Sequence, residues 1–326
     1  MSATRTPART PNPVATPTVA VVGAGSVGAT TAYAALVRGS ARRVALYDID
    51  RAKVEAEVAD LSHGLSFVPR GEIVGGDDIE VCRGASVVVV TAGGKQRPGQ
   101  SRMELAESTV GLVRTLMPQL LEVAPDAVYL LVTNPVDVVT QAALTVSGLP
   151  PARVIGSGTV LDSARLRHEI AARVGVAEQS VHASIVGEHG DSEFPLWSAA
   201  SIGGVPLLEW ERTTGRLGPA EREEIAEQVV TAAYRIIAGK GATNYAVGLA
   251  ATRIIEAVLR DEHRVLPVST WLEDYHGISD VCLSVPTLVG ADGAGQRLGL
   301  PFTEDERARL SASADSIRAT ARRVGL

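Results

Sequence analysis

The sequence predicts an α/β protein in which a doubly wound parallel-sheet domain is followed by an α+β domain with antiparallel strands. A strand, a glycine-rich turn and a helix follow one another from residue 18. Further continuous apolar runs of strand length, with helices between them, are typical of a parallel sheet covered on both faces. After about residue 155 the pattern changes to helices and alternating strands.

We therefore divide the chain into three parts. Residues 1–18 contain four prolines and no acidic residue, and they predict a disordered tail because proline forbids both helix and central strand. Residues 19–155 form the predicted parallel-sheet domain, and residues 156–326 form the second domain.

Composition narrows the class of protein. With 326 residues, 45% hydrophobic and 21% charged, the chain is long enough for two cores and is not disordered. The net charge of −6, from 31 basic and 37 acidic residues, argues against binding to nucleic acid or to a membrane surface. No apolar run reaches the ~20 residues of a membrane span. Cys82 and Cys282 are far apart and predict two buried thiols in a reducing, cytoplasmic setting.

The first domain reads as alternating strands and helices. A buried strand begins at Thr18, and an Ala-rich helix follows its glycine turn. A second strand ends at Asp48, and the helix after it closes at Gly64. The runs "ASVVVVTAGG" and "AVYLLVTNP" predict two more buried strands.

The second domain mixes helices with antiparallel strands. The pattern predicts a helix from Asp162 to Arg173 and a strand over Val181–Val186. A long helix has Pro219 near its start, and another spans Thr243–Leu259. Two alternating segments, "RVLPVSTWLEDYHG" and "ISDVCLSVPTLVG", flank a glycine turn as antiparallel strands do. The final helix begins with a capping box, "TEDE", at residues 303–306.

The glycine turn has the spacing GxGxxG, formed by Gly23, Gly25 and Gly28. It follows a strand, opens a helix, and has an acid, Asp48, 20 residues past its last glycine. Such a turn lets backbone approach a pyrophosphate at a helix N-terminus, and the acid accepts hydrogen bonds from a ribose. This pattern predicts a Rossmann domain that binds NAD rather than NADP, because Asp48 would repel a 2′-phosphate. The alternatives are a plain glycine turn, and Asp50 as the ribose acid rather than a helix cap.

A second set of residues matches carbonyl reduction. That chemistry needs a proton donor, a cation for an acidic substrate, and a group that polarises the carbonyl. Asp162 and Arg165 share a helix face, and His189 lies in a turn, "GEHGD". An acid beside a histidine favours the charged imidazole, and an arginine grips a carboxylate. A surface ion pair and a structural histidine explain the same residues without any chemistry, and Asn134, before Pro135, also suits a turn.

Seven segments together carry a resemblance. They are "VVGAGSVG", "YDID", "TAGGKQRPGQSR", "VTNPVDV", "GSGTVLDSARLR", "GEHGD" and "GKGATNYAVG". In this order the chain resembles the lactate/malate dehydrogenase family, from Thr18 onward, and it is most similar to the L-lactate branch. The resemblance implies reversible hydride transfer between NADH and pyruvate, giving L-lactate.

The resemblance also implies site residues. His189 is the expected proton donor and acceptor, Asp162 its orienting partner, and Arg165 the clamp for the substrate carboxylate. Arg102, in a loop that closes over substrate, is expected to polarise the carbonyl. Asn134 and Thr243 are expected to contact the reacting centre or line the substrate pocket. The expected cofactor-binding positions are Gly23, Gly25, Val27, Gly28, Asp48, Thr91, Gly93 and Asn134.

Gln96 is the residue expected to decide the substrate. Malate enzymes have an arginine there for a second carboxylate, and a neutral glutamine would leave that charge unpaired. Arg97 follows directly, so a register shift of one would favour malate, but the spacing to Pro98-Gly99 favours Gln96 and pyruvate. The alternatives are malate dehydrogenase, a dehydrogenase for a bulkier 2-hydroxy acid, and a catalytically silent NAD-binding protein.

Arg167 and His182 suggest regulation. Arg167 lies two positions after Arg165, which is about 200° around the helix, so it cannot face the same site. In relatives activated by fructose 1,6-bisphosphate, an arginine and a histidine at these positions bind the effector across a two-fold axis. The resemblance thus implies a homotetramer with such a site. No metal site is expected, since "GEHGD" lacks a second histidine at ligand spacing.

Overall fold

A computed structural model describes residues 17–94 and 102–326. Almost all of the predicted N-terminal tail lies outside the described residues, although Thr18 is already the first residue of a strand. Gln96 and Arg97 also lie outside them. For Arg102 the backbone alone is described, at the start of a helix.

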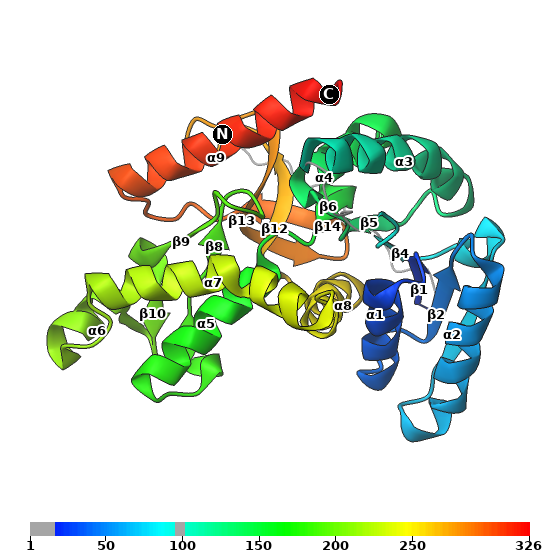
Figure 1. Cartoon of the computed structure of the whole chain (residues 1–326), viewed down its shortest axis with the longest axis horizontal. Coiled ribbons are helices and arrows are strands. Elements are labelled where there is room, and N and C mark those ends of the chain that lie inside the picture. The colour runs from blue at the N-terminus through cyan, green and yellow to red at the C-terminus, as the bar shows by residue number, and fades with distance from the viewer. Residues whose placement is uncertain (1–16, 95–101) are drawn as a thin grey trace, which may run out of the picture.

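One nine-stranded sheet runs through the molecule (Figure 1). Its parallel part contains β1 (Thr18–Val22), β2 (Arg43–Tyr47), β3 (Glu72–Gly76), β4 (Val87–Val90), β5 (Val128–Leu131) and β6 (Val154–Gly156). Its antiparallel part contains β12 (Arg264–Leu272), β13 (Val281–Gly290) and β14 (Gly293–Arg297). The order is β14-β13-β12-β6-β5-β4-β1-β2-β3. The two parts join where Ser269 of β12 pairs with Gly156 of β6.

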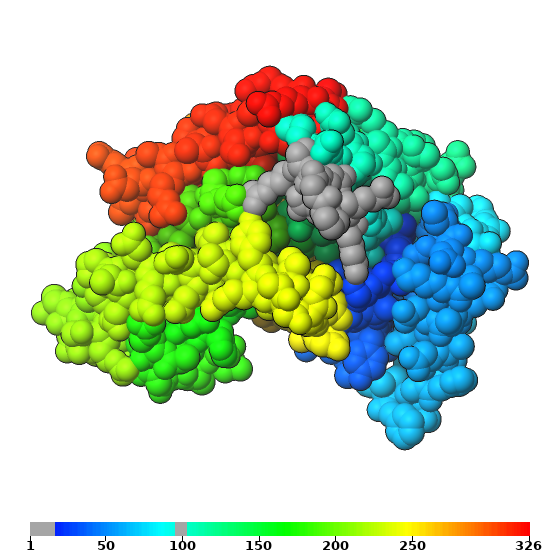
Figure 2. Space-filling view, viewed as in Figure 1, coloured from blue at the N-terminus to red at the C-terminus, as the bar shows by residue number. Residues whose placement is uncertain are grey.

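Helices cover both faces of this sheet, as the continuous apolar strands predict. On one face, Ala20 and Val22 of β1 pack in a core with α3 (Arg102–Val123), α4 (Val136–Ser147) and α9 (Glu304–Arg323). On the other face, Val19 and Val21 pack with α1 (Ser26–Val37), α2 (Arg51–His63) and α8 (Tyr245–Leu259). Figure 2 shows α8, in yellow, reaching across this view to α1, in blue.

Most of the remaining elements contribute to a third core beside the sheet, whereas Phe194 packs in the core of the first face. The remaining elements are α5 (Val160–Val174), α6 (Leu207–Thr214), α7 (Pro219–Lys240), the small strands β7 (Val181–His182), β8 (Ile185–Val186), β9 (Phe194–Pro195), β10 (Ser201–Ile202) and β11 (Val205–Pro206), and short 3-10 turns. The predicted second domain therefore contributes both this core and the antiparallel strands of the large sheet.

The predicted strand over Val181–Val186 is wrong in one respect, because it is two strands in different sheets. β7 pairs with β10, whereas β8 pairs with β9. The chain changes partners at Ala183-Ser184, where the Ser184 carbonyl accepts a hydrogen bond from Leu196 and the Ile185 N–H donates to Ser163 of α5. Alternation of side chains continues through such a change, so the sequence pattern does not show it.

Other local predictions agree closely with the structure. Thr303 and Glu306 form the predicted capping box. Both cysteines are free and buried. Helix α5 begins two residues before Asp162, and α8 begins at Tyr245 rather than Thr243. Within the part of the chain that the structure describes, no helix has both the length and the apolar character needed to cross a membrane.

Candidate active site

The glycine turn between β1 and α1 is shaped by close backbone contacts. An added Cβ at Gly28 would lie 1.8 Å from the Gly23 carbonyl oxygen, so no other residue fits there. Gly23 itself has φ of +106°, a conformation that favours glycine. The Thr91 hydroxyl, bonded to the Val22 and Gly23 carbonyls at 3.0 Å, holds the turn against β4. Of the residues that the structure describes, only Lys53 would meet a Cβ at Gly25, with its Nζ at 4.0 Å, which leaves open space beside the start of α1.

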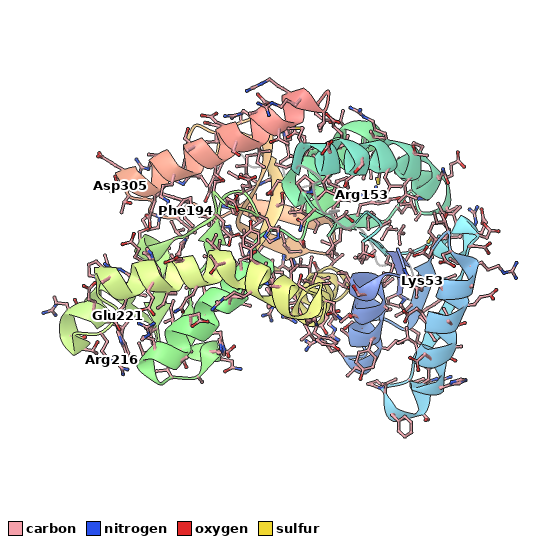
Figure 3. All side chains as sticks on the ribbon, in the orientation of Figure 1. Lys53, Arg153, Phe194, Arg216, Glu221 and Asp305 are labelled. Carbon is pink, nitrogen blue, oxygen red and sulfur yellow. The ribbon has the colours of Figure 1, made fainter. Side chains whose placement is uncertain are left out.

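The two candidate ribose acids have different surroundings. Asp48 follows β2, and one oxygen of its carboxylate accepts a 2.6 Å hydrogen bond from the Ala24 N–H in the glycine turn. Asp50 caps α2 by accepting a hydrogen bond from the Lys53 N–H at 3.1 Å, as expected of a helix cap. Lys53 Nζ lies 3.9 Å from Asp48, on the side of α2 that faces α1 (Figure 3). Asp48 is thus the acid that adjoins the glycine turn.

His189, Asp162 and Arg165 come together in the structure. Asp162 is buried on the first turn of α5, and its Oδ2 lies 2.8 Å from His189 Nδ1. Its Oδ1 accepts a 2.6 Å hydrogen bond from Arg165 Nη1. The Asp162 carboxylate thus contacts both His189 and Arg165. This contact fixes the imidazole with Nε2 directed away from Asp162, and the His189 side chain remains 27% exposed.

The charges in this group support one another. Burial alone would raise the pKa of Asp162, but attraction to His189 and Arg165 outweighs burial and lowers it. Burial alone would lower the pKa of His189, but the charge of Asp162 and its hydrogen bond raise that pKa well above its ordinary value. The arrangement therefore favours a protonated imidazole, which can give a proton to a substrate.

Three elements fix the backbone of the loop that carries His189. The His189 N–H donates a 2.8 Å hydrogen bond to Asp137 of α4. The Glu188 N–H donates to the Ser313 hydroxyl of α9 at 2.6 Å. Gly187 forms a bridge with Ser284 of β13. The loop is thus held by a helix on each side and by the antiparallel part of the sheet.

Glu193 is a residue of this group that sequence reasoning missed. Its side chain is 4% exposed, and its Oε2 lies 3.7 Å from His189 Nδ1. The sequence signal that points to it is its spacing, four residues after the histidine. The next residue, Phe194, which Figure 3 labels, is buried, and the guanidinium of Arg309 on α9 lies 4.5 Å from the centre of its ring. Asp162, His189 and Glu193 place one ligand atom each within 4.8 Å of one another, a set that could hold a metal ion. The guanidinium already bound to Asp162 disfavours a further cation there.

The other predicted residues occupy separate places. Asn134 is exposed in the loop after β5, three residues past the end of that strand, and its peptide bond to Pro135 is cis. Thr243 is half-buried in the loop between α7 and α8. Gly93 is exposed, and a Cβ there would meet Thr133 at 2.3 Å. Val27 is half-buried on α1.

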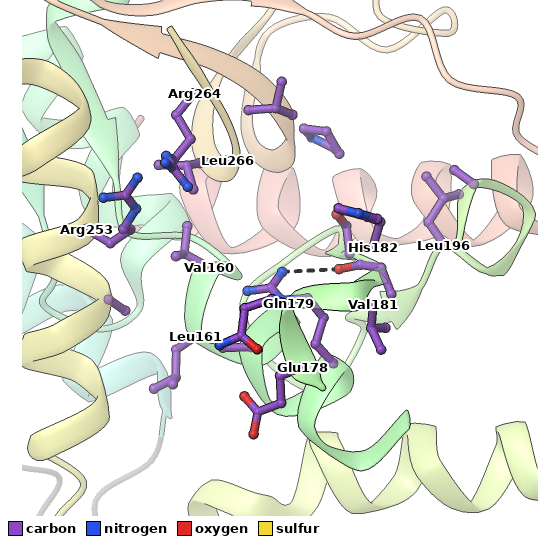
Figure 4. A pocket seen from close by; sticks show the side chains of 18 of the residues that line it. Val160, Leu161, Glu178, Gln179, Val181, His182, Leu196, Arg253, Arg264 and Leu266 are labelled. Carbon is purple, nitrogen blue, oxygen red and sulfur yellow. Dashed lines mark hydrogen bonds between the residues drawn. The ribbon is translucent and has the colours of Figure 1, made fainter. Parts of the chain in front are cut away.

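Arg167 and His182 line one cavity of about 810 Å³ (Figure 4). Arg167 donates a 3.3 Å hydrogen bond to the Ala183 carbonyl, next to His182 in the chain. Glu178 lines the same cavity and is bonded to His168 at 2.8 Å. The wall opposite contains Arg253 of α8 and Arg264 of β12. Arg165 and Arg167 therefore face different surroundings, as their spacing on α5 predicts.

Comparison with known proteins assigns the chain to a family. Residues 18–156 match the family model of the lactate/malate dehydrogenase NAD binding domain, and residues 159–324 match that of the lactate/malate dehydrogenase alpha/beta C-terminal domain. The chain belongs to the lactate/malate dehydrogenase family. It is therefore an NAD-dependent oxidoreductase with a Rossmann domain, as the resemblance implied.

Individual relatives agree with this assignment. The L-lactate dehydrogenase of Bifidobacterium animalis subsp. lactis is 53% identical over 96% of this chain and 99% of its own. That of Nitratidesulfovibrio vulgaris is 47% identical over 91% and 96%. Among solved structures, the minor L-lactate dehydrogenase of Enterococcus mundtii, in a ligands-bound form, superposes with a TM-score of 0.93 at 37% identity, covering 95% of this chain and 99% of that one. A lactate dehydrogenase from a deep-sea metagenome gives a TM-score of 0.92 with the same identity and coverage.

Proposed function

We propose that this protein is an L-lactate dehydrogenase that interconverts pyruvate and L-lactate with NAD in the cytoplasm. The observation that carries the proposal is the group formed by His189, Asp162 and Arg165. It provides a charged proton donor and an adjacent guanidinium in one place, joined by hydrogen bonds of 2.8 and 2.6 Å. The four curated or solved relatives named above are lactate dehydrogenases, which supports the same activity.

The glycine turn fits a dinucleotide. The cradle at Gly23 and Gly28 excludes a Cβ, the space beside Gly25 is open, and the first turn of α1 offers unpaired N–H groups to a pyrophosphate. Asp48 would hold the adenosine ribose, and Thr91 maintains the turn through the carbonyl of Gly23. When bound there, the cofactor supplies or accepts the hydride.

The other residues act on the substrate. Arg165 would hold the carboxylate of pyruvate in a two-point contact, while its neighbour Asp162 keeps the guanidinium in place. His189 would give its Nε2 proton to the carbonyl oxygen as reduction proceeds, and would take that proton back during lactate oxidation. We assign Arg102 to the developing charge on that oxygen, and Asn134 and Thr243 to the substrate pocket, on the resemblance alone.

Substrate choice tests the assignment of Gln96. With NADH, the protein should reduce pyruvate far faster than oxaloacetate, and Gln96→Arg should reverse that order. The reason is that a neutral side chain leaves the second carboxylate of oxaloacetate unpaired in a desolvated site. Arg97→Gln is the matched control, and it should leave the preference unchanged. A wild-type preference for oxaloacetate, or reversal by the control, would contradict the assignment.

We further propose a homotetramer that fructose 1,6-bisphosphate activates. Among the described residues, Arg167 donates one hydrogen bond, to a backbone carbonyl, and His182 is exposed beside it in the same cavity. Two such pairs facing each other across a two-fold axis would give four cationic groups for two phosphates. Arg167 and Asp162 both belong to α5. An effector bound to Arg167 would therefore favour one position of this helix, and with it one position of Asp162 in the active site.

Pyruvate titrations with and without fructose 1,6-bisphosphate test this regulation. The effector should lower the apparent KM for pyruvate, and Arg167→Gln or His182→Ala should abolish the effect without reducing the rate at saturating pyruvate. Arg212→Gln, which removes an exposed guanidinium of α6, is the control and should keep the response. Wild-type curves that superimpose at all protein concentrations would refute the regulatory proposal and leave the dehydrogenase assignment intact.

A further inference from the structure

A second carboxylate lies beside the His189 ring. Glu193 Oε2 is 3.7 Å from the same nitrogen, Nδ1, that Asp162 contacts at 2.8 Å. At 3.7 Å this contact is an ion pair and not a hydrogen bond. The Glu193 N–H donates to the Gly190 carbonyl, which turns the chain back so that the glutamate side chain reaches the histidine.

The surroundings of Glu193 make its charge dependent on His189. The side chain is 4% exposed, and within residues 17–94 and 102–326 no group donates a hydrogen bond to its carboxylate. A buried carboxylate without donors is stable when it is protonated or when it faces a cation. The cation that faces the Glu193 carboxylate is the His189 imidazolium, because the Arg165 guanidinium is hydrogen-bonded to Asp162 instead.

Charge balance couples the two groups. When His189 is charged, the four groups form two ion pairs, Asp162 with Arg165 and Glu193 with His189, and the cluster has no net charge. When His189 is neutral, an ionised Glu193 would leave one uncompensated negative charge in the cluster. Burial raises the pKa of Glu193 to about 7, so its carboxylate can take up a proton near neutral pH.

We propose that Glu193 is a second carboxylate partner of the His189 imidazolium and acts through it, taking up a proton from solvent whenever His189 loses its proton to substrate. This inference rests on the proposed role of His189 as the proton donor. Glu193 contacts the nitrogen opposite to the one that would face substrate, so it is a positioning residue. One proton leaves Nε2 of His189 for the carbonyl oxygen, and one proton from water neutralises the Glu193 carboxylate.

Other charged groups surround the ring and must be separated from this effect. On α5, the Asp162 carboxylate is the group that contacts the ring. On α4, Asp137 accepts a hydrogen bond from the His189 backbone N–H and not from the ring. The Glu188 carboxylate accepts from Ser192 at 2.5 Å. Within the described residues, the charged groups around the His189 loop are Asp137 of α4, Asp162 and Arg165 of α5, and Glu188 and Asp191 of the loop itself, while Arg309 of α9 lies over Phe194.

The test is a titration of the His189 ring by NMR in the intact protein, together with the pH dependence of kcat/KM for pyruvate. In Glu193→Gln the His189 pKa should fall by roughly one unit, because one of two facing charges is lost. The descending limb of kcat/KM should move to lower pH by the same amount, while the rate well below that limb stays within a few-fold of wild type. Glu193→Asp, which keeps the charge, should restore most of the wild-type midpoint.

Glu188→Gln is the matched control, because it removes a charge from the same loop without facing the ring. Its His189 midpoint should stay at the wild-type value. A folded Glu193→Gln protein whose His189 midpoint is unchanged, or a loss of rate that is uniform across pH, would overturn the inference. A wild-type kcat/KM profile that does not follow the His189 titration would instead overturn the proposed role of His189.

Discussion

The guanidinium of Arg38, at the end of α1, donates two hydrogen bonds, of 2.9 and 2.7 Å, to the carboxylate of Glu256 on α8. Ser40 donates to the same carboxylate at 2.9 Å, and Arg253 donates at 2.8 Å. Glu256 is almost fully buried, and burial would raise its pKa, but these donors outweigh burial and hold the pKa at about 2. The contact joins the glycine-turn helix to a helix from the second half of the chain.

Glu256→Gln should destabilise the protein because it leaves several cationic donors without their shared partner. We expect the free energy of unfolding to fall by about 3 kcal/mol, at the low end of what removing one partner of a buried ion pair costs, since the arginines are partly exposed. Urea denaturation at neutral pH measures this. Glu55→Gln, which breaks an exposed pair on α2, is the control and should cause no measurable change. Equal effects of the two substitutions would contradict the prediction.

Asp162→Asn should impair catalysis more than cofactor binding. His189 loses the larger of the two carboxylate charges that keep its pKa high, so a smaller fraction of the imidazole is protonated and able to give a proton at working pH. We expect kcat/KM for pyruvate to fall by roughly 100-fold or more, the scale of general acid catalysis. The Kd for NADH, measured by fluorescence, should change little. Asp315→Asn, at an exposed position of α9, should leave both quantities unchanged.

Cofactor choice should depend on Asp48 and not on Asp50. The wild-type protein should prefer NADH strongly over NADPH, because an added 2′-phosphate would face the Asp48 carboxylate. Asp48→Ser should narrow the ratio of kcat/KM for the two cofactors. Asp50→Ser keeps a capping residue on α2 and should leave the ratio unchanged. If the control narrows the ratio instead, the ribose acid is Asp50.

One buried acid should make the protein less stable as pH rises toward neutrality. Burial raises the pKa of Asp137 to about 6. Between pH 4.5 and 6 the unfolded chain has already released this proton, while the folded chain retains it. The unfolding free energy should therefore decrease with rising pH, at most by about 1.4 kcal/mol per unit.

Asp137→Asn tests this pH dependence. Urea denaturation at several pH values should give a flatter slope between pH 4.5 and 6 than in the wild type. Asp126→Asn, at an exposed position before β5, should retain the wild-type slope. Identical slopes in all three proteins would show that Asp137 is ionised throughout this range.

Much of the fold was predictable because local signals agreed with one another. The GxGxxG turn, the acid after β2 and the capping box each depend on residues close in sequence, and each lies where it was expected. The prediction was incomplete where short strands depend on distant partners. Strands β3, β6 and β14 were not predicted, and each contains glycine, such as Gly75, Gly156 and Gly293, which gives it little apolar character.

The site shows the same division. The spacing of Asp162 and Arg165 predicted a shared helix face, and the structure adds the bond between them. That His189 meets Asp162, 27 residues away in sequence, came from the resemblance and not from any local pattern. Glu193 was missed because an acid before a phenylalanine resembles a surface residue, and its burial depends on the turn at Gly190.

The pairing of β12 with β6 has a consequence for protein synthesis. The ribosome releases the six parallel strands in full before it reaches residue 264, where β12 begins. Until β12 is synthesised, β6 is paired with β5 only, and the backbone N–H and C=O groups of its other edge are free to pair with a strand of another chain. A nascent chain that stops between residues 157 and 263 therefore ends with an open sheet edge. Truncated products of that length should aggregate or require a chaperone, whereas a chain that includes residues 264–297 covers this edge with its own antiparallel strands.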